Sequence, residues 1–162
     1  MKVPCYIGVV GHKKSGKTTL IERLTAELTS RGLAIGTIKM TTHILQFDSP
    51  GKDTHRHRTA GSVVTLIKSR SEFALFTSAG YLDDNLISNI FSHCDIVLVE
   101  GDSGSKYPKI NVSDSRELRQ DIAGEVIAIW GDEKNNTTTR HFHFDQIPEL
   151  GDFLISKFSG KE

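Results

Sequence analysis

One short segment has the residue types and spacing of a phosphate-binding loop, or P-loop. The pattern G-x-x-x-x-G-K-[ST] is matched in full by the run Gly11-His12-Lys13-Lys14-Ser15-Gly16-Lys17-Thr18. In such a loop the backbone N–H groups surround phosphates, and the positive end of the following helix favours the same negative charge. We expect Lys17 to reach the β- and γ-phosphates and the Thr18 hydroxyl to reach Mg²⁺. The run and the adjoining Thr19 are therefore predicted to bind nucleotide, with Lys17 also catalytic.

A carboxylate must complete this site from the end of another strand, where it holds the metal or orders its water. Glu100 can supply it, because it closes the apolar run that begins after Asp95 and it precedes Gly101. Ligands of open α/β sheets bind at the carboxyl ends of the strands, so Glu100 is predicted to face the loop and Asp95 the opposite edge. The alternative is that Glu100 only ends a strand. We predict a catalytic and metal-side role for Glu100.

Two further carboxylates lie in a long polar stretch, residues 39–58, of the kind that often carries a switch or substrate-reading loop. Asp48 and Asp53 are each predicted as a second metal contact. Arg56 and Arg58 can neutralise phosphate charge from the same chain or across a dimer. A solvated charge cluster is the alternative interpretation of this group.

Asp132 is the candidate for reading the base. It follows Gly131 at the end of the apolar run from 126 to 130, and its carboxylate can accept hydrogen bonds from guanine. An aspartate after a strand also commonly caps a helix or forms a turn, so both interpretations stay open.

Two His-x-His pairs have a spacing that permits metal binding when the pair lies on a strand. They are His55 with His57 and His141 with His143. Neither pair has a nearby cysteine or a third spaced ligand, so the sequence favours ordinary surface or edge-strand histidines.

The elements that must position these residues alternate between strands and helices. Residues 6–10 form a short apolar run that fits a strand buried on both faces, and the apolar residues of 18–31 recur at helical spacing before Gly32. Further strands are predicted at residues 34–38, 63–67, 73–77, 95–99, 109–112 and 126–130, and further helices at 82–91 and 146–158. This alternation predicts an α/β protein with the three-layer P-loop NTPase fold, a mostly parallel sheet and helices on both faces.

Length and composition point to one domain. A chain of 162 residues forms one substantial core and not two, so residues 1–162 are predicted to be a single P-loop nucleotide-binding domain.

The charges of the 20 basic and 20 acidic residues cancel, so no global field favours nucleic acid or an anionic membrane. The apolar run 3–10 is too short to span a bilayer, and Cys5 and Cys94 are expected to be reduced core thiols. We therefore expect a cytoplasmic protein.

Nearly the whole chain resembles the molybdopterin-guanine dinucleotide biosynthesis protein B (MobB) family of P-loop GTP-binding proteins. The resemblance rests on the loop 11–18, on Gly36-Thr37-Ile38-Lys39, on Pro50-Gly51-Lys52-Asp53-Thr54 followed by Arg58-Thr59-Ala60-Gly61, and on Leu98-Val99-Glu100-Gly101. It implies a homodimer that binds GTP and Mg²⁺ and is a weak GTPase. It also implies an adapter role toward the molybdenum cofactor guanylyltransferase, with molybdopterin itself as a further binding partner. By position, Glu100 would lie by the metal, Asp53 would belong to the characteristic loop, and Asp132 would match an aspartate of the family.

Two positions depart from the family pattern. Met40 stands where members commonly have a histidine, with His43 three residues later, and Asp102 and Ser103 stand where an aromatic residue and a lysine are common. These changes concern the molybdopterin or partner-binding role rather than nucleotide binding. A paralogue with a different client is therefore an alternative.

Two other function classes stay open at this point. A P-loop small-molecule kinase would transfer the γ-phosphoryl group to an acceptor bound near Asp48 and Asp53. A nickel-delivery GTPase for metalloenzyme maturation is motivated by the seven histidines and by a similar overall build.

Overall fold

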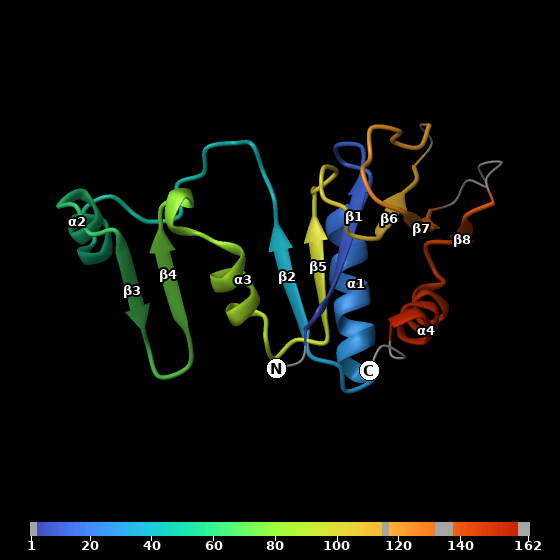
Figure 1. Ribbon diagram of the computed structural model, residues 1–162, viewed down its shortest axis with the longest axis horizontal. Coiled ribbons are helices and arrows are strands. Elements are labelled where there is room, and N and C mark those ends of the chain that lie inside the picture. Colours follow the sequence, from blue (N-terminus) through green and yellow to red (C-terminus); the bar gives the residue numbers. More distant parts are fainter. Residues whose placement is uncertain (1–2, 115–116, 132–137, 159–162) are drawn as a thin grey trace. The chain divides into compact units, whose positions relative to one another are not determined.

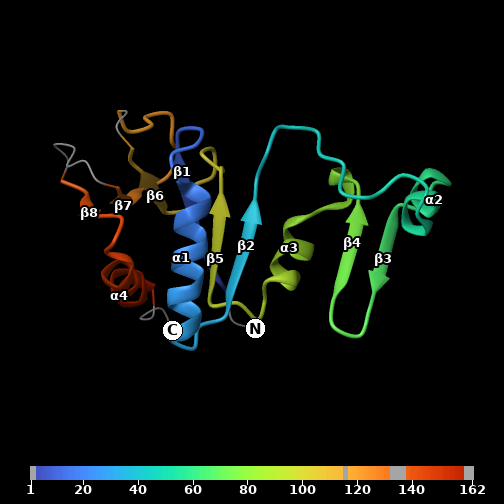
Figure 2. The same cartoon turned by 180° about the vertical axis from the view of Figure 1, so that it is seen from behind.

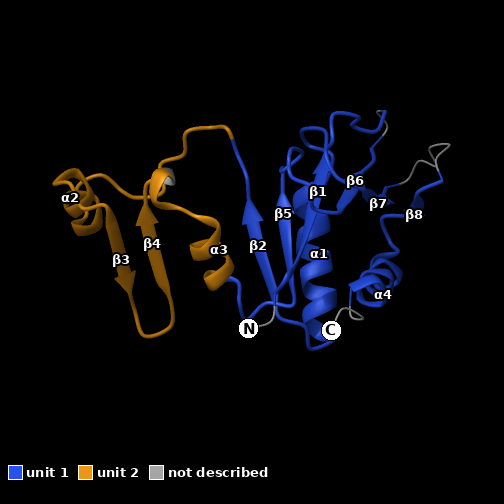
Figure 3. Ribbon diagram, viewed as in Figure 1, with its two compact units in different colours: residues 1–41, 91–162 blue, residues 42–90 orange. Residues whose placement is uncertain are grey.

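The computed structural model describes residues 3–114, 117–131 and 138–158 of the chain (Figure 1). The chain divides into two compact units, which Figure 3 colours separately. Unit 1 consists of Met1–Thr41 and Phe91–Glu162, and unit 2 consists of Thr42–Ile90. The P-loop and Glu100 both belong to unit 1.

A six-stranded sheet forms the centre of unit 1, with the strand order β2-β5-β1-β6-β7-β8. Its strands are β1 (Cys5–Gly11), β2 (Ile35–Lys39), β5 (Ile96–Glu100), β6 (Lys109–Val112), β7 (Val126–Trp130) and β8 (Arg140–Phe142). Every neighbouring pair runs parallel, and β2, β5 and β1 can be followed side by side in Figures 1 and 2. The unit also contains α1 (Lys17–Ser30) and α4 (Ile147–Phe158).

β1 lies in the middle of the sheet, where its residues are covered on both faces. Ile7, Val9 and Val10 are fully buried, as expected for a central parallel strand with a continuous apolar run. The chain leaves β1 through α1 toward β2, on the same side as β5, whereas β6 pairs on the other side of β1. The carboxyl end of β1 is therefore a topological switch point, where open α/β sheets bind their ligands.

Helices α1 and α4 pack together over one face of this sheet. Leu20, Leu24 and Leu28 recur every four residues along α1, and all three are fully buried. Leu150 and Leu154 of α4 are buried against the same core. This shared apolar stripe fixes α1, and with it the end of the P-loop, to the sheet.

Glycines on the opposite face of the sheet let the side chains of Phe91 and Lys109 lie close to the backbone. A Cβ on Gly36 would stand 2.6 Å from Cδ1 of Phe91, and a Cβ on Gly8 would stand 2.3 Å from Cδ of Lys109. Both separations are far shorter than a normal carbon–carbon contact. In unit 1 the Phe91 ring and the Lys109 stem therefore pack on this face only because glycine lies beneath each of them.

Unit 2 is a small α+β unit with its own sheet. It contains α2 (Asp53–Thr59), β3 (Val64–Lys68), β4 (Phe73–Thr77), a short 3₁₀ turn (Ala79–Tyr81) and α3 (Asp84–Ile90). β3 and β4 pair antiparallel as a two-stranded sheet.

The predicted fold class, a mostly parallel sheet with helices, is confirmed, and the expected strands and helices are present within one or two residues of their predicted ends. Besides the short 3₁₀ turn at Ala79–Tyr81, two elements were not expected. The polar stretch 39–58 contains the start of α2, which has no buried residue and hence no apolar stripe to reveal a helix. The other is β8, a strand of three residues. In the described residues, no helix combines the length and the apolar character needed to cross a bilayer.

Candidate nucleotide-binding site

The P-loop joins the end of β1 to the start of α1 through a backbone path that needs glycine. Gly11 has a φ of 149° and Gly16 a φ of 101°. A Cβ on Gly11 would stand 2.8 Å from the carbonyl oxygen of Val112. Lys14 is also left-handed, with a φ of 65°, a conformation that costs about 1–3 kcal/mol in a residue with a side chain. Strain of this kind is often found at ligand-binding loops.

The N-terminus of α1 lacks a capping side chain. Gly16 is the N-cap residue and makes no side-chain cap bond, and the first turn contains no acidic residue. Ser15 beside it is only 5% exposed, and in the described part of the chain its Oγ has no hydrogen-bond partner. Unsatisfied N–H groups and the positive end of the helix dipole together favour an anion here. The loop therefore fits a phosphate group.

Lys17 lies folded over this loop. Its Nζ donates to the carbonyl oxygen of Gly11 at 3.2 Å and to that of His12 at 2.5 Å. Lys13 and Lys14, by contrast, are exposed. The ammonium of Lys17 is thus held among the backbone groups that would surround a phosphate.

Thr18 and Glu100 meet at the carboxyl edge of the sheet. Thr18 Oγ1 donates to the Glu100 carboxylate, at 3.1 Å from Oε1 and 3.2 Å from Oε2. Glu100 ends β5 and is the register partner of Val9 in β1, while Thr19 is exposed on the first turn of α1. A hydroxyl beside a carboxylate offers the hard oxygen ligands that Mg²⁺ prefers, and this metal usually takes few ligands from protein.

Lys39 reaches the same carboxylate from the end of β2. Its Nζ lies 3.4 Å from Oε1 of Glu100, the oxygen that Thr18 also contacts. Lys39 belongs to the family motif Gly36-Thr37-Ile38-Lys39, but no role was predicted for it. The pairing of β2 with β5, which the sequence does not state, brings it to this site.

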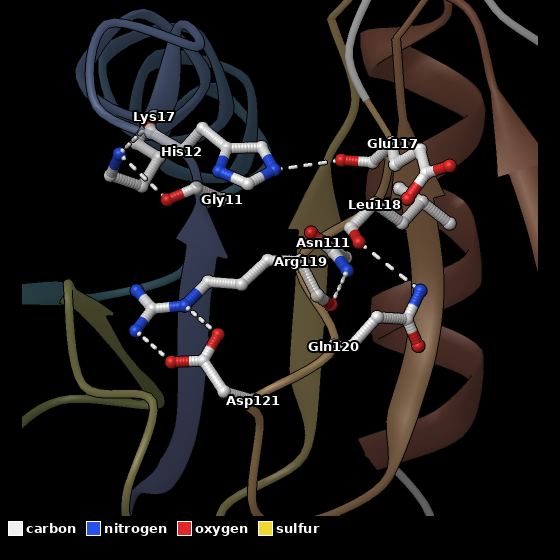
Figure 4. A network of polar contacts seen from close by, with 9 residues as sticks. All are labelled: Gly11, His12, Lys17, Asn111, Glu117, Leu118, Arg119, Gln120 and Asp121. Atoms are coloured by element: carbon white, nitrogen blue, oxygen red, sulfur yellow. Dashed lines mark hydrogen bonds and ion pairs between the residues drawn. The ribbon is translucent and has the colours of Figure 1, made fainter.

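A segment that begins at Glu117 lies beside the P-loop (Figure 4). His12 donates from Nε2 to the carbonyl oxygen of Glu117 at 2.7 Å, and Asn111 of β6 donates from Nδ2 to the carbonyl oxygen of Arg119 at 3.0 Å. Arg119 donates twice to Asp121, each time at 2.7 Å. This pairing lowers the pKa of the Asp121 carboxyl and raises the pKa of Arg119. The segment is thus tied to the phosphate loop, and no sequence motif had indicated it.

Lys109 fixes the loop that follows Glu100. It is fully buried, and its Nζ donates to the carbonyl oxygen of Ser105 at 3.0 Å, to Ser105 Oγ at 2.6 Å and to the carbonyl oxygen of Tyr107 at 3.0 Å. Burial lowers the pKa of Lys109, and the charge of Asp102 opposes this shift. Three hydrogen bonds from one ammonium therefore set the path of the backbone beyond Glu100.

The base-reading prediction falls at the end of β7. Trp130, the last residue of β7, is 1% exposed, and its Cζ3 would stand 3.7 Å from a Cβ on Gly16. The strand thus ends against the P-loop. Asp132 itself lies outside the described residues.

The predicted residues of unit 2 make contacts within that unit. Asp48 accepts a hydrogen bond from Thr54 Oγ1 at 3.1 Å, and its carboxylate lies 3.5 Å from the Arg58 guanidinium. Asp53 lies 3.9 Å from Arg56. A metal role for Asp48 and Asp53 stays a prediction.

The two His-x-His pairs differ in their settings. His55 and His57 lie on a helix, where residues two apart point roughly 200° away from each other, so the strand geometry considered for them does not apply. His141 lies in β8, and its ring centroid is 5.1 Å from that of His143. Across the described residues, no group of three or more His, Cys, Asp or Glu side chains is placed to hold a metal ion.

Comparisons with known proteins agree on one family. The family model described as Molybdopterin guanine dinucleotide synthesis protein B matches residues 6–132. A Bacillus subtilis protein named probable molybdopterin-guanine dinucleotide biosynthesis adapter protein is 32% identical, over 96% of this chain and 94% of the relative. The Haemophilus influenzae molybdopterin-guanine dinucleotide biosynthesis adapter protein is 30% identical, over 91% of this chain and 86% of the relative. The crystal structure of Bacillus subtilis MobB has a TM-score of 0.76 at 28% identity, covering 97% of this chain and 99% of that one.

Proposed function

Because the chain belongs to the family of molybdopterin guanine dinucleotide synthesis protein B, we propose that it is a GTP-binding adapter in molybdenum cofactor biosynthesis. It assists formation of molybdopterin guanine dinucleotide in the cytoplasm, as a single nucleotide-binding domain that includes both units. The observation that carries the proposal is the Thr18–Glu100 contact at the end of the P-loop. It puts oxygen ligands for a metal beside an uncapped helix N-terminus.

The P-loop residues hold the phosphates of the nucleotide. The N–H groups at the start of α1 bind phosphate oxygens, and Lys17 exchanges the carbonyl oxygens of Gly11 and His12 for the β- and γ-phosphates. The buried Ser15 hydroxyl gains a partner at the same time.

Thr18 and Glu100 form the metal side of the site. Thr18 offers its hydroxyl oxygen, and Glu100 offers a carboxylate or orders a water molecule. Bound Mg²⁺ would neutralise the negative charge that develops on the phosphates during hydrolysis.

We propose that hydrolysis is slow and that the protein acts mainly through its nucleotide state. Rapid P-loop GTPases use an arginine at the γ-phosphate, which is worth about 10³–10⁵ in rate. Arg56 and Arg58, the candidates from the sequence, are paired with Asp53 and Asp48, and Arg58 also lies 4.9 Å from the centroid of the Phe76 ring. Their present contacts do not favour that role.

Guanine specificity is assigned to Asp132. Its support is positional: β7 ends at Trp130 against the P-loop, and Asp132 follows two residues later. A carboxylate can accept two hydrogen bonds from the guanine base and none from adenine in the same orientation.

The partner is proposed to be the nucleotidyltransferase that makes the guanine dinucleotide, with molybdopterin as a further ligand. Met40 directly follows β2, and Asp102 and Ser103 come just after Glu100, the last residue of β5, so the departures lie at two neighbouring strand ends. Met40 is 54% exposed, so this edge can present a surface to a client protein.

A homodimer is proposed to form through the sheet of unit 2. One face of this sheet carries Val64, Leu66, Phe73 and Leu75, which are all exposed. A two-stranded sheet is marginally stable alone, and a contiguous exposed apolar face commonly marks an interface.

Reconstitution of guanine dinucleotide formation tests the adapter function. Purified guanylyltransferase, molybdopterin and Mg²⁺–GTP are combined with the wild-type chain, with Lys17→Ala, or with Lys157→Met as a control on α4. We expect the wild type and the control to raise product formation above that of the guanylyltransferase alone. Lys17→Ala should not raise it. Absence of stimulation by the wild type would reject the proposal.

A further inference from the structure

Lys39 stands opposite Glu100 at the edge of the sheet where nucleotide is proposed to bind. The two residues are register partners in the parallel pair β2–β5, and Glu100 is in turn the register partner of Val9 in β1. Both strands end at this point, so both side chains belong to the same carboxyl edge.

The backbone around Lys39 is locked to that of Glu100. The N–H of Met40 donates to the carbonyl oxygen of Glu100 at 2.8 Å. Gly101 has a φ of 87°, and a Cβ there would stand 2.9 Å from the carbonyl oxygen of Met40. Glycine after Glu100 therefore permits the close approach of the two strand ends. The backbone of Lys39 therefore stays beside Glu100, whichever group its ammonium binds.

The side chain of Lys39, unlike its backbone, is free to change partner. It is 63% exposed, and its ion pair with Glu100 spans 3.4 Å. Glu100 is only 14% exposed, but the lysine keeps most of its contact with solvent at this separation, so release of the ammonium costs little. Thr18 binds the same carboxylate oxygen, which places the Lys39 ammonium next to the proposed metal and phosphate centre.

A nucleoside triphosphate would give Lys39 a better partner than Glu100. The terminal phosphate carries more negative charge than a carboxylate, and lysine is a compact point charge suited to phosphate. When Glu100 binds the metal or its water, its carboxylate attracts the Lys39 ammonium less strongly. Lys17 reaches the β- and γ-phosphates from the P-loop. Lys39 would bring a second cation to the terminal phosphate from the end of β2.

We infer that Lys39 contacts the terminal phosphate and makes this site prefer a nucleoside triphosphate over a diphosphate. The inference rests on the proposed nucleotide-binding function. It assigns to Lys39 a specificity role that reports whether the γ-phosphate is present.

Equilibrium binding of GDP and of the non-hydrolysable analogue guanosine 5′-(β,γ-imido)triphosphate, both with Mg²⁺, tests the inference. Lys39→Met is compared with wild type, with Lys39→Arg and with Lys157→Met. Lys157 is a matched control, because it pairs with Glu125 at 3.7 Å on α4 of the same unit. Thermal unfolding of each variant verifies that it is folded.

We expect Lys39→Met to bind the triphosphate analogue about 10- to 100-fold more weakly, which is the loss of one charge-assisted contact, and GDP within about twofold of wild type. Lys39→Arg should keep most of the preference, and Lys157→Met all of it. An unchanged ratio of the two affinities in Lys39→Met, or an equal loss of both, would overturn the inference while the nucleotide site stands. Failure of the wild type to bind either nucleotide would instead remove the proposed function and the inference with it.

Discussion

Single residues set the shape of this site through their contacts. Some of these contacts can be predicted from the sequence, and others cannot. Gly11 and Gly16 are part of a local motif, and their left-handed backbone follows from it. Gly8 is different, because its lack of a side chain leaves room for the aliphatic part of Lys109, a residue about one hundred positions later. A buried lysine on a strand has no sequence signature, so its role required the structure.

Lys109 gives stability a pH dependence that can be measured. Burial lowers its pKa in the folded chain, so between this lowered value and the ordinary lysine value of about 10.4 the unfolded chain binds more protons. The lysine therefore makes stability rise with pH across that window, and its cost is greatest below the folded pKa. Urea unfolding of wild type and Lys109→Met from pH 7 to 10.5 isolates this contribution.

The difference in unfolding free energy between wild type and Lys109→Met should shift in favour of wild type as pH rises. Lys157→Met, which changes an exposed lysine, should follow the wild-type curve. Parallel curves for wild type and Lys109→Met would show that the ammonium titrates as it does in the unfolded chain.

At the scale of elements, the sequence predicted those helices and strands that have a regular pattern of apolar residues. Strands β1, β5 and β7 of the main sheet are largely continuous apolar runs, and α1 has buried leucines at helical spacing, so these elements were predicted. α2 has no apolar face and was read as part of a loop. β3 and β4 were predicted as strands, but their pairing with each other outside the main sheet depends on contacts that no local pattern encodes.

The exposed face of β3 and β4 predicts a dimer that a charge can break. Phe73 is 67% exposed and belongs to the apolar face that also carries Leu66. Phe73→Glu should convert the dimer to a monomer in light scattering coupled to size exclusion, because a carboxylate buried in an apolar interface is costly. Ile90→Glu, at an exposed position of α3, should leave the dimer intact. A wild-type monomer, or a Phe73→Glu dimer, would contradict this interface.

At the scale of the whole molecule, strand order decides which residues share a site. The P-loop could be predicted because all its residues are consecutive, and Glu100 because β5 was expected to end near it. Lys39 and the segment from Glu117 were not assigned roles, because their places depend on which strands are neighbours and on hydrogen bonds from Asn111 and His12. The predicted family is confirmed, which supports the same arrangement of strands around the loop.

Residues 11–18 are proposed to bind a guanine nucleotide through its phosphates. Titration calorimetry of the wild-type chain and of Lys17→Ala with GTP and with ATP, each with Mg²⁺, tests it most directly. We predict tighter binding of GTP than of ATP by wild type, and a loss of about 10- to 100-fold or more in Lys17→Ala with the unfolding temperature unchanged. Equal binding of GTP by wild type and Lys17→Ala would contradict the site, and a preference for ATP would contradict the assignment of guanine.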